Sequence, residues 1–172
     1  MRILFISSDN YDDSEMLYPY YRLIEEGFEG SIASMNKGKI IGKHGMEINV
    51  DLEIDEVDVN DYDGLLLPGG TAPEKLRQQE KPVEVVRLFA KQKKPIASIC
   101  HGQQLLISAK ALNGKKATCY PGIKDDLVNA GAIYIDEPAV VCENLVTSRR
   151  PQDLPYFMRE YIKVLKANNG DN

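Results

Sequence analysis

A chain of 172 residues with 43% hydrophobic and 27% charged residues has the composition of one globular domain, and it argues against long disordered segments. The net charge of -5 disfavours a nucleic acid or an anionic membrane as a partner. No repeat, low-complexity tract or linker interrupts the sequence. We therefore expect a single domain over residues 1–172.

Targeting and redox signals are those of a cytoplasmic protein. The apolar opening run, residues 2–7, is too short for a signal peptide, and no stretch approaches a transmembrane span. The three cysteines, Cys100, Cys119 and Cys142, cannot form a closed set of disulfides, and none has C-x-x-C spacing. We expect free thiols in the cytoplasm. The sequence also contains no metal-ligand cluster, phosphate loop or dinucleotide fingerprint, so we expect neither a metal nor a cofactor.

Strand-like and helix-like segments alternate in the first half of the chain. Residues 2–7 predict a buried strand, and a helix follows from N-cap candidates at 12–14 to Gly27. Residues 31–35 predict a second strand, and glycines among β-formers predict a hairpin over 37–51.

A further strand at 63–67 leads directly into Pro68-Gly69-Gly70, and apolar residues at helical spacing follow from Val83. Residues 96–99 predict a short central strand ending at Cys100, and 101–112 predict a helix. The remaining chain repeats the scheme, with strands at 118–120, 132–135, 140–142 and 145–147, and helices at 123–129 and 154–165.

This alternation predicts an α/β fold with a mostly parallel sheet and helices on both faces. Ligands bind such sheets at the carboxyl ends of the strands. Pro68-Gly69-Gly70 and Cys100-His101-Gly102 both lie at predicted strand ends. The chemistry of this protein should therefore be sought at these two turns.

Cys100 is the strongest candidate for a reactive group. It follows a strand and precedes a helix, as the nucleophile of a hydrolase elbow does. Backbone N–H groups and the helix dipole at such a position are expected to lower the thiol pKa from about 8.5. The alternative is a small buried hydrophobic residue, and this alternative is favoured for Cys119 and Cys142, which lie inside strand-like runs. The adjacent His101 favours the nucleophile at Cys100.

The other candidate residues have two interpretations each. His101 is either the base for the thiol or a surface histidine at a helix start. Glu15 lies in the first turn of its helix, where the dipole favours a carboxylate whatever its function. Gly69 and Gly70 either donate N–H groups to an oxyanion or form an ordinary turn.

At these residues the sequence resembles the PfpI family of intracellular cysteine proteases. This family belongs to the superfamily of the Parkinson's-disease-linked deglycase, which has the class I glutamine amidotransferase-like fold. The resemblance covers nearly the whole chain and is carried by five segments: Glu15-Met16-Leu17-Tyr18-Pro19, Leu66 to Glu74, Ala97 to Gly102, Tyr120 to Asp126, and Thr147-Ser148-Arg149. One departure is Gln103, where relatives often carry Pro.

The resemblance implies a flavodoxin-like three-layer sandwich in which Cys100 is the nucleophile. Glu15 would be a buried, partly protonated carboxyl that hydrogen-bonds the thiolate. His101 would be the base, oriented by Glu74 from a neighbouring subunit of a homo-oligomer, which ranges from a dimer to a hexamer. From the residues alone, Glu74 is equally a solvated carboxylate near a helix start.

The resemblance further implies an oxyanion- and substrate-binding set of four residues, namely Gly69, Gly70, Tyr120 and Arg149. It predicts a PfpI-type peptidase, with a cofactor-free glyoxalase or deglycase as the close alternative. The substrate would then be a peptide or a small aldehyde. A third, non-enzymatic possibility is a redox-responsive or chaperone-like stress protein with an oxidisable Cys100. Glutamine amidotransferase activity is excluded because no histidine follows His101.

Overall fold

The computed structural model describes residues 1–170, so the last two residues of the predicted 1–172 domain lie outside the described part. Its centre is a seven-stranded sheet in the order β10-β11-β7-β6-β1-β2-β5. All neighbouring pairs in this sheet are parallel except β10–β11. The strands are β1 (Arg2–Ile6), β2 (Glu29–Ser34), β5 (Leu52–Glu53), β6 (Gly64–Leu67), β7 (Ile96–Ile99), β10 (Ala139–Cys142) and β11 (Leu145–Ser148).

Two small sheets flank the central one. The predicted hairpin is the antiparallel pair β3 (Gly38–Ile41) and β4 (Glu47–Val50). The second is a parallel pair of two-residue strands, β8 (Lys116–Ala117) and β9 (Ile133–Tyr134).

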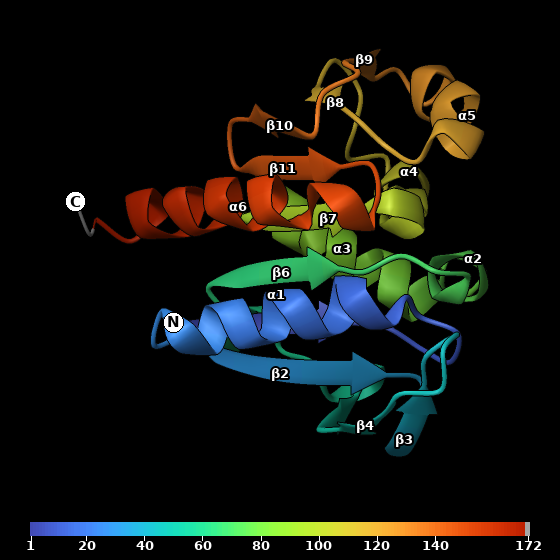
Figure 1. Cartoon of the computed structure of the whole chain (residues 1–172), viewed down its shortest axis with the longest axis vertical. Helices are drawn as coiled ribbons and strands as arrows, with labels where there is room; N and C mark the ends of the chain where they lie inside the picture. Colours follow the sequence, from blue (N-terminus) through green and yellow to red (C-terminus); the bar gives the residue numbers. More distant parts are fainter. Residues whose placement is uncertain (171–172) are drawn as a thin grey trace.

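Helices cover both faces of the sheet, which confirms the predicted three-layer arrangement. Helices α1 and α6 lie together on one face, in front of the sheet in Figure 1. Helices α3, α4 and α5 pack on the other face. The helices are α1 (Asp13–Glu25), α2 (Ala72–Leu76), α3 (Glu80–Lys91), α4 (Gln103–Ser108), α5 (Lys124–Asn129) and α6 (Leu154–Asn168).

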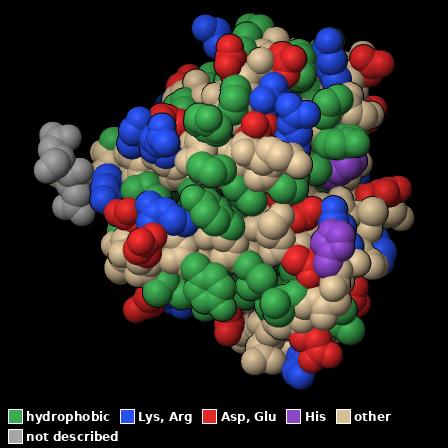
Figure 2. Space-filling model, in the orientation of Figure 1, with side chains coloured by type: hydrophobic (Ala, Val, Ile, Leu, Met, Phe, Trp, Pro, Cys, Tyr) green, Lys and Arg blue, Asp and Glu red, His purple; other side chains and the backbone are tan. Residues whose placement is uncertain are grey.

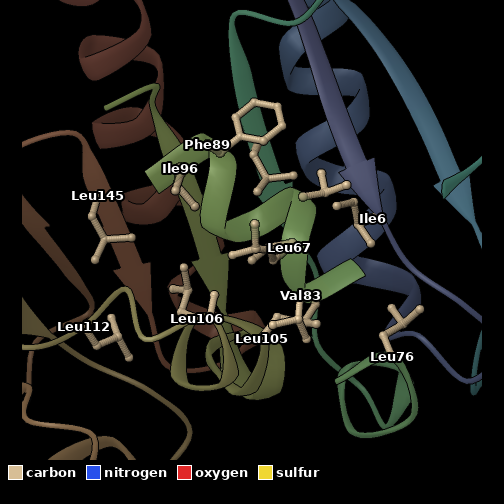
Figure 3. Close-up of a cluster of buried hydrophobic side chains, with 14 of the residues drawn as sticks. Ile6, Leu67, Leu76, Val83, Phe89, Ile96, Leu105, Leu106, Leu112 and Leu145 are labelled. Atoms are coloured by element: carbon tan, nitrogen blue, oxygen red, sulfur yellow. The ribbon is translucent and has the colours of Figure 1, made fainter. Parts of the chain in front are cut away.

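The central strands are apolar because both of their faces are covered. Every residue of β6 and β7 is buried, as expected for strands of a parallel sheet between two helical layers. Figure 3 shows the cluster beneath α3 and α4, in which Leu67, Phe89 and Leu106 meet. The carboxyl ends of β1, β6 and β7 are thereby fixed side by side at one edge of the sheet.

The start of α1 is set by a side-chain cap. Asp12 Oδ1 accepts hydrogen bonds from the N–H groups of Ser14 and Glu15, at 3.1 and 3.3 Å. These N–H groups lack partners within the helix, so the carboxylate replaces the missing carbonyls. The cap fixes Glu15 in the first turn of α1, directly after β1.

Two predicted elements are wrong in their bounds. The helix expected over 101–112 is instead a 3-10 turn, Cys100–Gly102, followed by α4, which ends at Ser108 because Lys110 adopts a left-handed φ of 58°. No strand forms at the expected residues 118–120, because the strand β8 covers only Lys116–Ala117. In the segment after Ala117, the N–H of Tyr120 donates to the carbonyl of Cys100 and not to a neighbouring strand.

Within residues 1–170, no helix combines the length and the apolar character that crossing a membrane requires.

Gln103 connects three segments behind the nucleophile turn. Its buried Nε2 lies 3.2, 2.9 and 2.9 Å from the carbonyl oxygens of Ser98, Thr118 and Ser148, so its two N–H groups serve three acceptors and one N–H is shared. A proline at this position could not make these bonds. Gln103 therefore joins the ends of β7 and β11 to the segment after β8, and holds the base of the site together.

Replacing Gln103 with methionine should lower the free energy of unfolding by about 1–3 kcal/mol, because a buried donor is lost while the carbonyls stay buried. Urea unfolding followed by circular dichroism measures this change. Gln104→Met is the matched control, since Gln104 is also buried but has no counterpart to the Nε2 hydrogen bonds of Gln103 among the described residues. Equal losses in the two variants would contradict a specific role for Gln103.

Candidate active site

Cys100 occupies a strained turn directly after β7. Its φ is 61°, in the left-handed region that residues with a side chain rarely adopt. Such backbone strain costs about 1–3 kcal/mol and is concentrated at functional sites. The carbonyl of Cys100 accepts the N–H of Tyr120 at 3.3 Å, which helps to hold the turn. The predicted strand–turn–helix arrangement is thus present, with the thiol at the carboxyl end of a central strand.

His101 lies beside the thiol. Its Nδ1 is 3.2 Å from Cys100 Sγ, within hydrogen-bonding distance for sulfur. The ring stacks on that of Tyr120, with centroids 4.7 Å apart and an interplanar angle of 28°. Burial lowers the pKa of His101 below its ordinary value of 6.5. The imidazole is therefore neutral at neutral pH and can accept the proton of the thiol.

Glu15 is fully buried and points at the same turn. One carboxyl oxygen, Oε2, accepts the N–H of Gly69 at 2.8 Å. The other, Oε1, makes no conventional hydrogen bond within the described residues, and the nearby thiol of Cys100 lowers the pKa of the carboxyl slightly. Burial and the charge of Asp12 outweigh these effects and raise the pKa of Glu15 from 4.5 to about 8. Glu15 is therefore protonated at neutral pH.

Gly69 and Gly70, which follow β6, lie so close to neighbouring atoms that a residue with a side chain would not fit at either position. A Cβ at Gly69 would overlap Glu15 Oε2 and lie 2.8 Å from the Cβ of Cys100. Gly70 has a φ of 78°, and a Cβ there would collide with the backbone of residues 10–12. The bond to Glu15 also uses the N–H of Gly69 that we expected to face an oxyanion. Gly69 therefore positions Glu15, and of the two glycines only Gly70 remains available for the predicted oxyanion role.

The pKa of the Cys100 thiol differs from the sequence-based expectation. Burial raises it, and the ionised carboxyl of Glu15 raises it further, whereas the N–H of His101 lowers it. The expectation of a lowered pKa considered the backbone N–H groups but not the burial and the nearby carboxyl. A thiolate at this site needs a protonated Glu15 and a base that accepts the proton.

A pocket of about 410 Å³ opens onto the thiol. It lies at the edge of the sheet to which the strand arrows point in Figure 1, and Figure 2 shows the histidine side chains gathered at this edge. The residues that line it come from six segments of the chain: Asn10, Asp12, Lys43, Gly70, Thr71, Cys100, His101, Tyr120 and Pro151. Tyr120, predicted for substrate binding, is thus part of the pocket wall.

Lys43 and Asp12 are pocket residues that were not predicted from the sequence. Lys43 Nζ and Asp12 Oδ2 are 2.6 Å apart, and Lys43 extends from the turn of the β3–β4 hairpin. The sequence marked Asp12 only as a cap, and nothing in the spacing of Lys43 indicated that its hairpin folds over the end of β7.

The remaining predicted residues lie outside the pocket wall. Arg149 is held by Asp136 and Asp153, at 2.8 and 2.9 Å, and its guanidinium does not line this pocket. Glu74, on α2, makes no hydrogen bond to His101 within residues 1–170. Its charge is nevertheless close enough to raise the pKa of His101, which burial lowers more strongly.

The other two cysteines are separate from the pocket. Cys119 is fully buried, and burial raises its pKa to about 12. Cys142 is on the edge strand β10 and is partly exposed. No group of three or more histidine, cysteine, aspartate or glutamate side chains among residues 1–170 could hold a metal ion.

The substitution Glu15→Gln should change the pH dependence of stability. The folded protein keeps the proton of Glu15 up to about pH 8, whereas the unfolded chain loses it near pH 4.5. Between these values the folded state binds more protons, so the free energy of unfolding falls as pH rises, by at most about 1.4 kcal/mol per pH unit. Urea unfolding should therefore show that the free energy of unfolding of Glu15→Gln rises relative to that of wild type as the pH increases across this range.

The same variant should lower the apparent thiol pKa, because an amide cannot ionise and repel the thiolate. Alkylation of Cys100 by iodoacetamide as a function of pH, assigned by mass spectrometry, measures this pKa. Glu25→Gln, on the exposed end of α1, is the control. If Glu15 acted only on the helix dipole, the thiol titration would be identical in all three proteins.

Comparisons with known proteins agree over most of the chain. The DJ-1/PfpI family matches residues 1–164. Deglycase PfpI of Pyrococcus furiosus is 53% identical over 166 residues, which are 96% of this chain and 100% of that protein. A Bacillus subtilis protein named "Putative cysteine protease YraA" is 42% identical over 166 residues, covering 96% of this chain and 98% of its own.

Solved structures share the fold. A ThiJ/PfpI domain protein from Brachyspira murdochii superposes with a TM-score of 0.93 at 26% identity, covering 96% of each chain. DJ-1 of Schizosaccharomyces pombe superposes with a TM-score of 0.86 at 21% identity, covering 99% of this chain and 97% of its own. The second match, at this identity, supports the flavodoxin-like α/β fold alone.

Proposed function

The chain belongs to the DJ-1/PfpI family, and from this membership and the pocket geometry we propose that it is a cysteine-dependent hydrolase with Cys100 as nucleophile. The observation that carries the proposal is the convergence of three groups at one strand edge. The thiol of Cys100 lies on a strained turn, His101 Nδ1 is 3.2 Å from it, and the buried carboxyl of Glu15 faces the same turn.

Each group has a role that follows from its protonation state. The neutral His101 accepts the thiol proton as the sulfur attacks. The protonated Glu15 lies beside the resulting thiolate without repelling it, and its O–H can donate to the sulfur. The raised thiol pKa keeps the resting site neutral, so the proton is transferred when a substrate is bound.

A small aldehyde or its protein adduct is the substrate that we favour. Cys100 is only 8% exposed, at the bottom of a pocket of about 410 Å³, which suits a small molecule better than an extended peptide. The Pyrococcus relatives at 51–53% identity are named deglycases. On these two grounds we propose the deglycase reaction first and the PfpI-type peptidase, expected first from the sequence, second.

For methylglyoxal the reaction needs no cofactor. The sulfur bonds to the aldehyde carbon, and the carbonyl electron pair moves to oxygen. Within the hemithioacetal, one proton then moves from this carbon to the neighbouring carbon and the hydroxyl proton moves to that carbon's oxygen, which leaves a thioester of lactate. Water cleaves the carbon–sulfur bond and releases lactate and the free thiol.

Peptide hydrolysis is the second candidate. It is supported by the protease name of the Bacillus subtilis relative at 42% identity. The same nucleophile and base would form an acyl-enzyme, and water would release the peptide acid. Since both reactions use the same three residues, only substrates can separate them.

Purified protein should convert methylglyoxal to lactate, and Cys100→Ser should reduce the rate at least about a thousandfold, as loss of a nucleophile does. Lactate is measured enzymatically, with fluorogenic peptides tested side by side. Cys142→Ser is the control, because Cys142 does not line the pocket. Peptide cleavage without lactate formation would favour the peptidase, and full activity of Cys100→Ser would contradict both reactions.

Self-association is a further part of the proposal. The family resemblance implies that Glu74 of one subunit orients His101 of another in a homo-oligomer. Within one chain these residues are not hydrogen-bonded, which is consistent with a partner that supplies the carboxylate. A carboxylate on the imidazole would fix its tautomer and stabilise the imidazolium formed as Cys100 ionises.

Mixed oligomers test this arrangement. Glu74→Gln should reduce turnover without changing sedimentation, whereas Glu84→Gln, on α3, should change neither. Combining Glu74→Gln subunits with Cys100→Ser subunits should restore activity, because some intact thiols then face an intact Glu74. An active monomer, or no recovery despite proven subunit exchange, would contradict a site shared between subunits.

A further inference from the structure

Attack of the Cys100 sulfur on a carbonyl creates an oxyanion, and of the two glycines predicted to donate to it only Gly70, which lines the pocket, keeps its N–H available. The N–H of Gly69 is bonded to Glu15 at 2.8 Å. The N–H of His101 interacts with the thiol itself. A single backbone N–H is thus left for the oxyanion, and a charged donor in the pocket can replace the donor that Gly69 does not supply.

Lys43 is the one lysine or arginine among the described residues that line this pocket. Its Nζ contacts Asp12 Oδ2 at 2.6 Å. An ammonium has three N–H donors, so two remain for other partners. The side chain is 43% exposed, whereas that of Asp12 is 5% exposed, so the ammonium is the accessible end of this ion pair.

Asp12 does not cancel the charge of Lys43 alone. Its other oxygen, Oδ1, accepts the N–H groups of Ser14 and Glu15 and the hydroxyl of Ser14. The carboxylate charge is thus shared with the start of α1, whose dipole also favours an anion. Hydrogen bonding to Asp12 raises the pKa of Lys43, so this lysine stays cationic while Glu15 and His101 are neutral.

The backbone that carries Lys43 is fixed to the loop after β1. The N–H of Lys43 donates to the carbonyl of Tyr11 at 2.9 Å. Asp13 accepts the N–H groups of His44 and Met46, each at 2.9 Å, and the buried Tyr11 hydroxyl donates to the carbonyl of Met46. The backbone from which Lys43 extends is therefore fixed before a substrate arrives, and the ion pair with Asp12 directs its ammonium to this side of the pocket.

We propose that Lys43 binds the oxyanion formed when Cys100 adds to a carbonyl carbon, and so selects substrates with an unhindered aldehyde or ketone oxygen. In this step the thiol proton goes to His101, the carbon–sulfur bond forms, and the π electron pair moves to the oxygen that Lys43 contacts. The inference rests on the proposed function, because it assigns a role within the same reaction.

Protection of Cys100 by acetaldehyde tests this binding without turnover. Acetaldehyde forms the hemithioacetal but has no second carbonyl, so it cannot proceed to a thioester. In wild type it should slow alkylation of Cys100 by iodoacetamide. In Lys43→Met, the acetaldehyde concentration that halves the rate of Cys100 alkylation should rise about tenfold or more, because a hydrogen bond from a charged group is lost. Lys43→Arg, which keeps the charge, should retain most of the protection.

Lys39→Met is the matched control. Lys39 also lies on the hairpin and forms an ion pair, with Glu47 at 2.8 Å, but it does not line the pocket. Its acetaldehyde protection should equal that of wild type. Unchanged protection in Lys43→Met would overturn the inference. So would an equal loss in Lys43→Met and Lys39→Met, which would indicate a disturbed hairpin.

Turnover separates this inference from the proposed function. Lys43→Met should reduce kcat/KM for methylglyoxal by about a hundredfold, which is the cost of removing one oxyanion donor. This reduction should be larger than the change that the same substitution causes in the rate of Cys100 alkylation without aldehyde. Equal changes in kcat/KM and in the alkylation rate would show that Lys43 acts only on the reactivity of the thiol, and they would overturn the inference. A wild type that is protected by acetaldehyde through Lys43 but converts no substrate would support the inference and contradict the proposed function.

Discussion

The carboxyl of Glu15 is completely enclosed between the turn after β6 and the turn after β7. The identity and position of most other residues in the site depend on this buried carboxyl. Burial raises its pKa from 4.5 to about 8, which corresponds to roughly 5 kcal/mol of disfavoured ionisation. One hydrogen bond, from the N–H of Gly69, offsets part of this cost. The protein therefore holds a neutral acid next to a thiol, where an ionised one would oppose the formation of a thiolate.

That constraint explains the residues around it. Only glycine fits at 69, since a Cβ would occupy the space of the Glu15 oxygen. The N–H of Gly69 is then committed to the carboxyl, and the pocket must stabilise a developing oxyanion with other groups. The cation of Lys43, placed by a hairpin that is bonded to the loop after β1, is available for this purpose. Acid, nucleophile and cation thus form one electrostatic unit built from separate parts of the chain.

The support behind the turn is equally specific. Gln103 ties Ser98, Thr118 and Ser148 together through one amide group. Its bonds fix the ends of β7 and β11 beneath a turn whose nucleophile adopts a strained φ of 61°. Packing from both helical layers holds these strands in place, so the strain at Cys100 is maintained by the surrounding fold. Gln103 therefore supports the nucleophile turn from behind through polar contacts.

Local patterns in the sequence were sufficient for the order of strands and helices, the mostly parallel sheet and the place of Cys100 after a central strand. These features depend on apolar runs, caps and glycines that are close together in the chain. The sequence could not show that burial would raise the pKa of Cys100, that Arg149 would be bound by two aspartates, or that Lys43 would reach the pocket. Each depends on which side chains meet in the folded chain, and for Cys100 and Lys43 the neighbours come from separate elements at the carboxyl edge of the sheet. The chain by itself determined the nucleophile and its turn, and the tertiary structure decided its electrostatic surroundings, because burial and charge proximity are properties of the packed fold.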